Sequence, residues 1–144
     1  MKVEIYPACE SREISECFLG ELERGWTRAF QLLKEAGVGE IAGLDVLEIT
    51  LLDDDEMSRL HGEFLGDASP TDVITFEHGE LLIGVEVAAR QAVEFGSEAD
   101  REVALYGVHG MLHLSGFDDR SSRDAKEMAV RQEEVLAACF AFER

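Results

Sequence analysis

Apolar residues recur along the chain with two different periods, which predict strands and helices. Short runs rich in Val, Ile and Leu predict strands at residues 2–6, 44–52, 73–76 and 80–87. Apolar residues spaced three and four apart predict helices at residues 11–36, 54–64, 86–95, 98–115 and 122–142. The turn residues His78 and Gly79 separate the last two strands, which either form a hairpin or lie side by side. No repeat or linker interrupts residues 1–144, so we expect a single α+β domain with a small mixed sheet covered by helices.

Capping residues predict where several of these helices begin and end. Asp53 is placed to cap the second helix, Ser97 the fourth, and either Ser121 or Ser122 the last. Gly116 follows the fourth helix, where the chain needs the left-handed turn that glycine adopts freely.

The charge of the chain narrows the possible functions. Thirty-one acidic residues against thirteen Lys and Arg leave a net charge of −18. This excludes a strongly basic nucleic-acid binder, because non-specific affinity for phosphate grows with Lys and Arg contacts. The acids are spread along the chain and predict a solvated surface. RNA could still bind where a metal ion or a few arginines create a local positive site.

Other features predict a cytoplasmic protein without a membrane partner. No run approaches the roughly 18 apolar residues of a membrane span, and the first residues lack the apolar segment of a secretory signal. The three cysteines are odd in number and form no CxxC pair, which predicts thiols in a reducing compartment.

The segment HGMLHLSGFDD, residues 109–119, carries the candidate chemistry. His109 and His113 are four residues apart on a predicted helix, which separates them by about 40° around the axis and about 6 Å along it. Both imidazoles can therefore reach one ion. Asp119 lies three residues beyond Gly116 and can fold back as a third ligand. Two neutral imidazoles and a carboxylate suit zinc with an open position for water.

Other interpretations of this segment remain open. A pair of histidines at this spacing also arises by accident, and a histidine facing the core is often satisfied by backbone groups. Zincin peptidases carry HExxH, in which the glutamate activates water, but Gly110 stands at that position and cannot take a proton. Two histidines and a carboxylate also hold iron in oxygenases, although the local HxxxH spacing favours zinc.

Three segments together resemble the YbeY family of metal-dependent endoribonucleases, which mature ribosomal RNA. HGMLHLSGFDD matches a family signature close to HGxLHLxGYDH, and PTDVITF at residues 70–76 matches PTDVLSF. GELLIGVEVAARQA, starting at Gly79, echoes a third. The resemblance implies an α+β fold with a four-stranded sheet and a single-strand-specific endoribonuclease. It also implies one zinc or other divalent ion per chain held by His109, His113 and Asp119. The expected partners are ribosomal RNA and the small ribosomal subunit, not DNA.

Two positions depart from the family pattern. The third ligand of the family is a histidine, and Asp119 stands there; the neighbouring Asp118 is the alternative ligand. A carboxylate lowers the net charge of the site and should make bound water less acidic. The family also has an arginine where this chain has Leu65. The bases that could contact phosphate instead are Arg59, Arg120 and Arg123.

Glu80 and Asp72 are the candidate catalytic residues. Glu80 could act as a general base at the cleft, or face water on its strand. Asp72 could orient a metal-binding histidine, or hold the loop after Pro70. Besides the endoribonuclease, two functions remain as alternatives: a metal-binding ribosome-assembly factor with little catalytic activity, and a zinc-dependent peptidase or other hydrolase.

Overall fold

The computed structural model describes residues 1–9 and 15–142. Within them the chain forms four strands, five α-helices and one short 3-10 helix. In chain order these are β1 (Lys2–Ala8), α1 (Glu16–Glu35), η1 (Glu40–Gly43), β2 (Val46–Leu52), α2 (Asp54–Leu65), β3 (Val73–Phe76), β4 (Glu80–Gly84), α3 (Val85–Phe95), α4 (Ala99–Leu114) and α5 (Ser122–Cys139). The predicted α+β class, the four-stranded mixed sheet and the five helices are confirmed.

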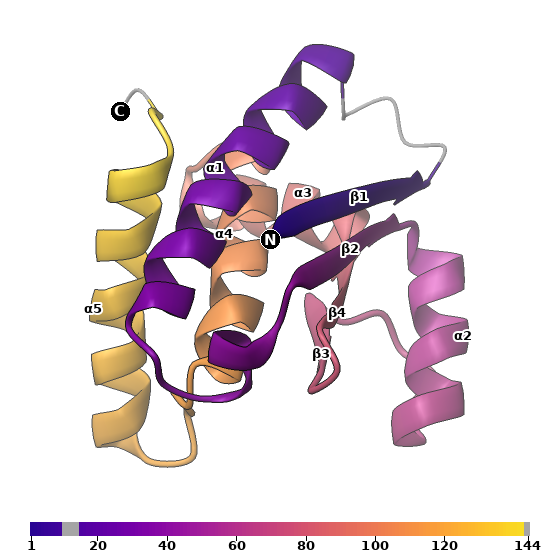
Figure 1. Cartoon of the computed structure of the whole chain (residues 1–144). Coiled ribbons are helices and arrows are strands. Elements are labelled where there is room, and N and C mark those ends of the chain that lie inside the picture. The colour runs from indigo at the N-terminus through magenta and orange to yellow at the C-terminus, as the bar shows by residue number, and fades with distance from the viewer. Residues whose placement is uncertain (10–14, 143–144) are drawn as a thin grey trace.

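The sheet has the strand order β1-β2-β4-β3. β1, β2 and β4 run parallel, whereas β3 pairs antiparallel with β4 and forms the hairpin that the turn residues allowed. α1, α4 and α5 lie on one side of the sheet and α2 on the other (Figure 1). β3 is an edge strand that packs beside α4. The backbone N–H and C=O groups on its outer side therefore have no neighbour to pair with among the described strands.

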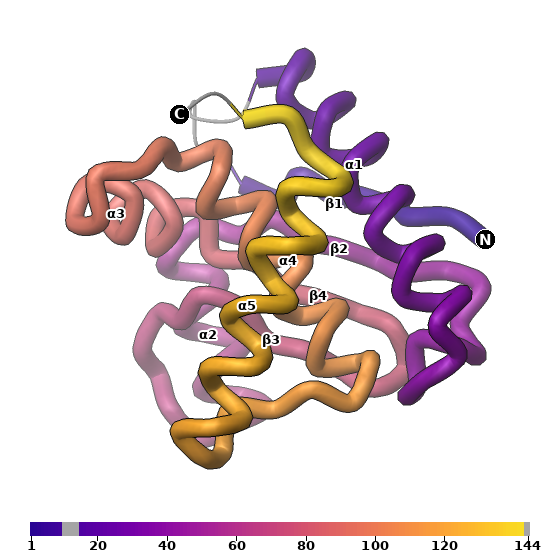
Figure 2. Tube along the Cα trace, turned by 90° about the vertical axis from the view of Figure 1, so that its left-hand side faces the viewer, coloured from indigo at the N-terminus to yellow at the C-terminus, as the bar shows by residue number. Residues whose placement is uncertain are grey.

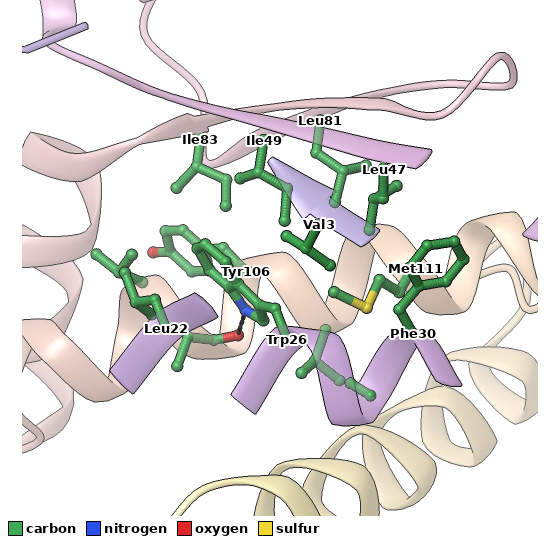
Figure 3. Close-up of a cluster of buried hydrophobic side chains, with 14 of the residues drawn as sticks. Val3, Leu22, Trp26, Phe30, Leu47, Ile49, Leu81, Ile83, Tyr106 and Met111 are labelled. Carbon is green, nitrogen blue, oxygen red and sulfur yellow. Dashed lines mark hydrogen bonds between the residues drawn. The ribbon is translucent and has the colours of Figure 1, made fainter. Parts of the chain in front are cut away.

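The main core lies between the sheet and α1 and α4. Alternate residues of the strands point into it, and the sticks in Figure 3 show them facing Trp26 and Met111 from the helices. The opposite face of the sheet carries a smaller cluster beneath α2, built from Leu52, Met57, Ile74 and Leu82. The period of two along each strand therefore assigns every strand residue to either the α4 side or the α2 side.

α4 is the central helix of the fold. It packs against α1, α3 and α5, and α5 crosses in front of it in Figure 2. Ten of its sixteen residues are buried, which is typical of a helix enclosed by its neighbours. Trp26 of α1 donates a hydrogen bond from Nε1 to the Ala104 carbonyl at 3.1 Å. A Cβ on Gly107 would lie 2.3 Å from the same nitrogen, so glycine is what allows the indole to sit against α4.

Several predicted boundaries need correction. Residues 85–87 belong to α3 and not to a strand. The N-cap of α4 is Glu98, and Ser97 does not cap it. Ser97 instead completes the end of α3, because its N–H donates to the Ala92 carbonyl at 2.8 Å after the left-handed Gly96.

The ends of the other helices agree more closely with the pattern. Ser121 caps α5 by accepting a hydrogen bond from the Asp124 N–H at 3.1 Å. α5 ends at Cys139, three residues earlier than expected. The first helix begins at Glu16, and the part of its prediction over residues 11–14 lies outside the described residues. α2 begins after Asp53 as predicted, although the Asp53 side chain makes no cap hydrogen bond.

None of the helices in the described part of the chain combines the length and apolar character that a membrane span requires.

Candidate metal centre

The two histidines of α4 face each other at the surface of the helix. Their Nε2 atoms are 3.1 Å apart, and their ring planes meet at 81°. Each ring is held through its other nitrogen. The His109 Nδ1–H donates to Oε1 of Gln132 on α5 at 2.7 Å, and the His113 Nδ1–H donates to the Phe117 carbonyl at 3.2 Å. A carbonyl oxygen only accepts, so these partners leave both Nε2 atoms as lone pairs directed at one place.

Two lone pairs at this distance repel unless a proton or a cation lies between them. Burial and the neighbouring His109 lower the pKa of His113, which favours the neutral imidazole that binds metals. Two nitrogens about 2.05 Å from a tetrahedral zinc ion would be roughly 3.3 Å apart, close to the observed separation. The hydrogen bonds at both Nδ1 atoms are the outer contacts that orient metal-binding histidines in other proteins.

The loop after α4 brings a carboxylate to the same place. Gly116 adopts a φ of 93°, which turns the chain back toward the helix. Asp119 then offers an oxygen that lies with both imidazole nitrogens in a group whose atoms are all within 4.8 Å of one another. Asp118, the alternative ligand, is not part of this group, and its Oδ1 accepts a hydrogen bond from the Arg120 N–H at 3.1 Å in the turn. The donor set therefore fits a zinc ion with one position left open for water or substrate.

The histidines open into a surface cleft of about 750 Å³. β3, the end of α2 and the loop after α4 form its other walls. Leu65, at the position of the family arginine, lies on its rim and is 62% exposed. Five carboxylates line the cleft: Glu40, Asp72, Glu77, Asp118 and Asp119. Among the described lining residues, Arg120 is the single Lys or Arg.

The other two candidate arginines are engaged elsewhere. Arg59 forms ion pairs with Glu56 and Glu63 on the exposed surface of α2. Arg123 bonds Glu127 within α5 at 3.2 Å. Neither arginine is among the residues that line the cleft, so Arg120 is the one placed to meet a phosphate group there.

The two candidate catalytic residues occupy different sides of the sheet. Asp72 lines the cleft beside His109, and its Oδ1 accepts a hydrogen bond from the Val73 N–H at 2.7 Å, which holds the loop into β3. Glu80 is paired in register with Phe76 and shares the α2 face with Leu82. It lines a separate hollow, and its Oε1 lies 3.2 Å from Nε2 of His78. The structure brings Asp72 to the histidines and leaves Glu80 away from them, so a catalytic role for Glu80 gains no support from its position.

Gly110 stands at the position where a zincin peptidase carries its catalytic glutamate. A Cβ at this position would lie 2.8 Å from Cδ2 of Leu81 and 3.2 Å from Oγ1 of Thr75. The helix therefore lies against side chains of the sheet where a zincin would carry its glutamate, and a side chain at this position would require Leu81 and Thr75 to move.

Gln132 is a site residue that the sequence interpretation missed. It lies among the apolar residues of α5 that recur at helical spacing, so the pattern alone does not single it out. The signal that could have identified it is a single amide among Met128, Val135 and Leu136. A polar side chain that points toward the protein interior needs a hydrogen-bond partner there.

Comparisons with known proteins identify related sequences and a related fold. The family described as "Endoribonuclease YbeY" matches residues 12–139. Proteins named Endoribonuclease YbeY from Symbiobacterium thermophilum and Pelotomaculum thermopropionicum are each 33% identical, over 76% and 85% of this chain and 80% and 87% of their own lengths. The solution structure of a Thermotoga maritima protein shares the fold, with a TM-score of 0.64 and 24% identity over 94% of this chain and 90% of that chain. The chain belongs to the YbeY endoribonuclease family.

Proposed function

We propose that this protein is a metal-dependent endoribonuclease that cuts single-stranded RNA. Its substrate is ribosomal RNA, and its work belongs to the maturation and assembly of the small ribosomal subunit in the cytoplasm. Residues 1–144 act as one domain, with one zinc ion per chain held by His109, His113 and Asp119. The observation that carries the proposal is the pair of Nε2 atoms 3.1 Å apart, with both Nδ1 atoms already hydrogen-bonded, in a chain of this family.

The side chains around the histidines divide the remaining tasks. A zinc ion in this place would polarise a phosphoryl oxygen and lower the pKa of bound water. Gln132 and the Phe117 carbonyl fix the two rings so that Nε2 of each faces the cleft. Arg120 supplies the positive charge that holds a phosphate among five carboxylates. Asp72 keeps the loop before β3 in place and forms the wall beside His109.

Single-stranded RNA fits this cleft better than a duplex. The acidic surface offers little attraction to a continuous phosphate backbone, so affinity must come from one metal-centred contact and from exposed bases. Bases are free for such contacts only in unpaired RNA, where aromatic side chains can stack on them.

The direct test compares His113→Ala with a matched change at an exposed histidine, His78→Ala. We expect the zinc-loaded wild type and His78→Ala to cut an end-labelled single-stranded RNA, and His113→Ala to leave it intact. His78 lies in the turn after β3, so its loss controls for removing an imidazole. Unchanged cutting by His113→Ala would overturn the proposal.

The acid-rich cleft supports one alternative, a ribosome-assembly factor that binds metal and does little chemistry. Five carboxylates around a single arginine oppose the approach of phosphate. On this alternative the metal-loaded protein binds the small subunit and leaves its RNA intact. Turnover of RNA that depends on His113 would refute it.

A further inference from the structure

A second hollow, of about 510 Å³, adjoins the metal centre and is formed by α3, α4, α5 and the loop before β3. His109, Asp72 and Gln132 belong to its wall, so the hollow begins where the cleft ends. Its volume lies in the range of about 300–1,000 Å³ that is typical of small-ligand sites. Nothing in the chemistry of the metal centre described above uses this space.

Glu102 is the unexplained group in this hollow. It is a residue of α4 that lines the hollow although it is only 5% exposed. Within the described part of the chain its carboxyl group has no hydrogen-bond donor and no ion-pair partner. The adjacent Arg101 is engaged by Glu133 at 2.6 Å. The Glu102 oxygens are not among the described side-chain atoms that are fully buried without a partner, so they open into the hollow. Water or the N–H groups of a ligand can meet them there.

The rim of the hollow offers an aromatic surface. Phe95, at the end of α3, lines the hollow and is 68% exposed. Gln91, one turn earlier on α3, adds an amide to the same wall. An exposed ring and a hydrogen-bonding group in one hollow are the features that proteins use to stack and read an unpaired base.

We propose that this hollow binds a guanine base of the RNA, in the nucleotide next to the phosphate at the metal centre. An ionised carboxylate only accepts hydrogen bonds and presents two oxygens. Guanine offers two adjacent donors, N1–H and N2–H, on one edge. Uracil offers one donor, while adenine and cytosine place an acceptor nitrogen beside their amino group. Glu102 accepts from both guanine donors, and Phe95 stacks on the base.

The position of Glu102 along α4 suits this assignment. It lies seven residues before His109, which is two helical turns or roughly 10 Å. That distance is comparable with the reach from a phosphate to the edge of its own base. The inference rests on the proposed function, because it takes the ligand of the neighbouring metal centre to be RNA.

The test measures binding of 2′-O-methyl trinucleotides UGU, UAU, UCU and UUU to the zinc-loaded full chain. We expect UGU to bind at least about tenfold more tightly than the other three, as for a good bidentate contact to a base. Glu102→Gln should bind all four within about twofold of one another, since the amide no longer offers two acceptors. The control Glu94→Gln removes one charge from an exposed residue of α3 outside the hollow and should keep the preference.

Two further readouts keep the result decisive. Phe95→Ala changes an exposed side chain and should weaken UGU binding about fivefold or more through lost stacking, even if Glu102→Gln folds poorly. Equal binding of the four oligonucleotides by the wild type, or a guanine preference that survives in Glu102→Gln, would overturn the inference. Cleavage of unmodified RNA is scored separately. Cleavage without guanine preference rejects the base site alone, and guanine preference without cleavage rejects the nuclease alone.

Discussion

Replacing Glu102 with glutamine should raise the stability of the folded protein at neutral pH. Glutamine has nearly the same shape, so the substitution leaves no cavity in the wall of the hollow. It removes the carboxylate of a residue that is 5% exposed, and this carboxylate has no hydrogen-bond donor in the described part of the chain. The variant therefore gains the free energy that the wild type loses by burying this charge, while losing the group that we assign to guanine.

The size of the gain follows from the burial of the carboxylate. A buried polar group without a partner costs about 1–3 kcal/mol, and we take the lower part, ~1–2 kcal/mol, because the oxygens border an open hollow. For a chain of this length the melting temperature changes by about 3–4 °C for each kcal/mol. Glu102→Gln should therefore melt roughly 3–8 °C above the wild type at pH 7 to 8.

The gain should depend on pH in a definite direction. Burial raises the pKa of Glu102 above that of the unfolded chain, while Arg101 opposes this shift and Glu133 adds to it. Below the pKa of the unfolded chain, Glu102 is protonated in both states and does not lower the free energy of unfolding. The wild type loses stability as the pH rises through the folded pKa, because the buried group must then ionise. The difference in stability between variant and wild type should vanish in acid and grow as the pH rises.

Thermal unfolding across the pH range measures this difference directly, with Glu94→Gln as the control for loss of an exposed charge. That control should change the melting temperature by no more than about 1–2 °C. A Glu102→Gln variant that is less stable than the wild type at neutral pH would refute the reasoning. A gain of the same size at every pH would also refute it, because it could not come from the carboxylate.

Three further predictions concern the metal centre and its supports. Gln132→Ala removes the acceptor for an Nδ1–H and should weaken zinc affinity about 10–100-fold, measured by competition with a chelator. Gly107→Ala places a methyl group 2.3 Å from Nε1 of Trp26 and should cost ~1–3 kcal/mol in chemical denaturation. Arg120→Gln should raise KM for RNA and lower the slope of log affinity against log salt by about one, whereas Arg123→Gln should leave both unchanged.

The parts of the site that the sequence predicted are those that depend on local geometry. The spacing of His109 and His113 fixes their separation once α4 forms, and Gly116 turns the loop so that Asp119 returns to them. The strands and the cap at Ser121 were likewise readable from short-range patterns. The three matched motifs indicated the protein family and, through it, the metal ion.

The remaining features depend on contacts between distant segments. Gln132 reaches His109 only because α5 packs across α4, and no pattern within α5 shows this crossing. Alternation along β4 separates Glu80 from Leu81, but only the topology decides which of the two sides faces α4. Ser97 satisfied the rule for a helix cap, yet the Gly96 turn that ends α3 uses its N–H first. Glu102 gave no signal, because an acid in the first turn of a helix is ordinary.

The most direct test of the account is a zinc titration of the chelated protein, followed by its initial rate of single-stranded RNA cleavage. We expect no cleavage without metal and a rate that rises to a plateau at about one zinc per chain, as for a single site with three protein ligands. A full rate in the chelated protein, or no cleavage at any zinc concentration, would contradict the claim that His109, His113 and Asp119 form the metal centre of a nuclease.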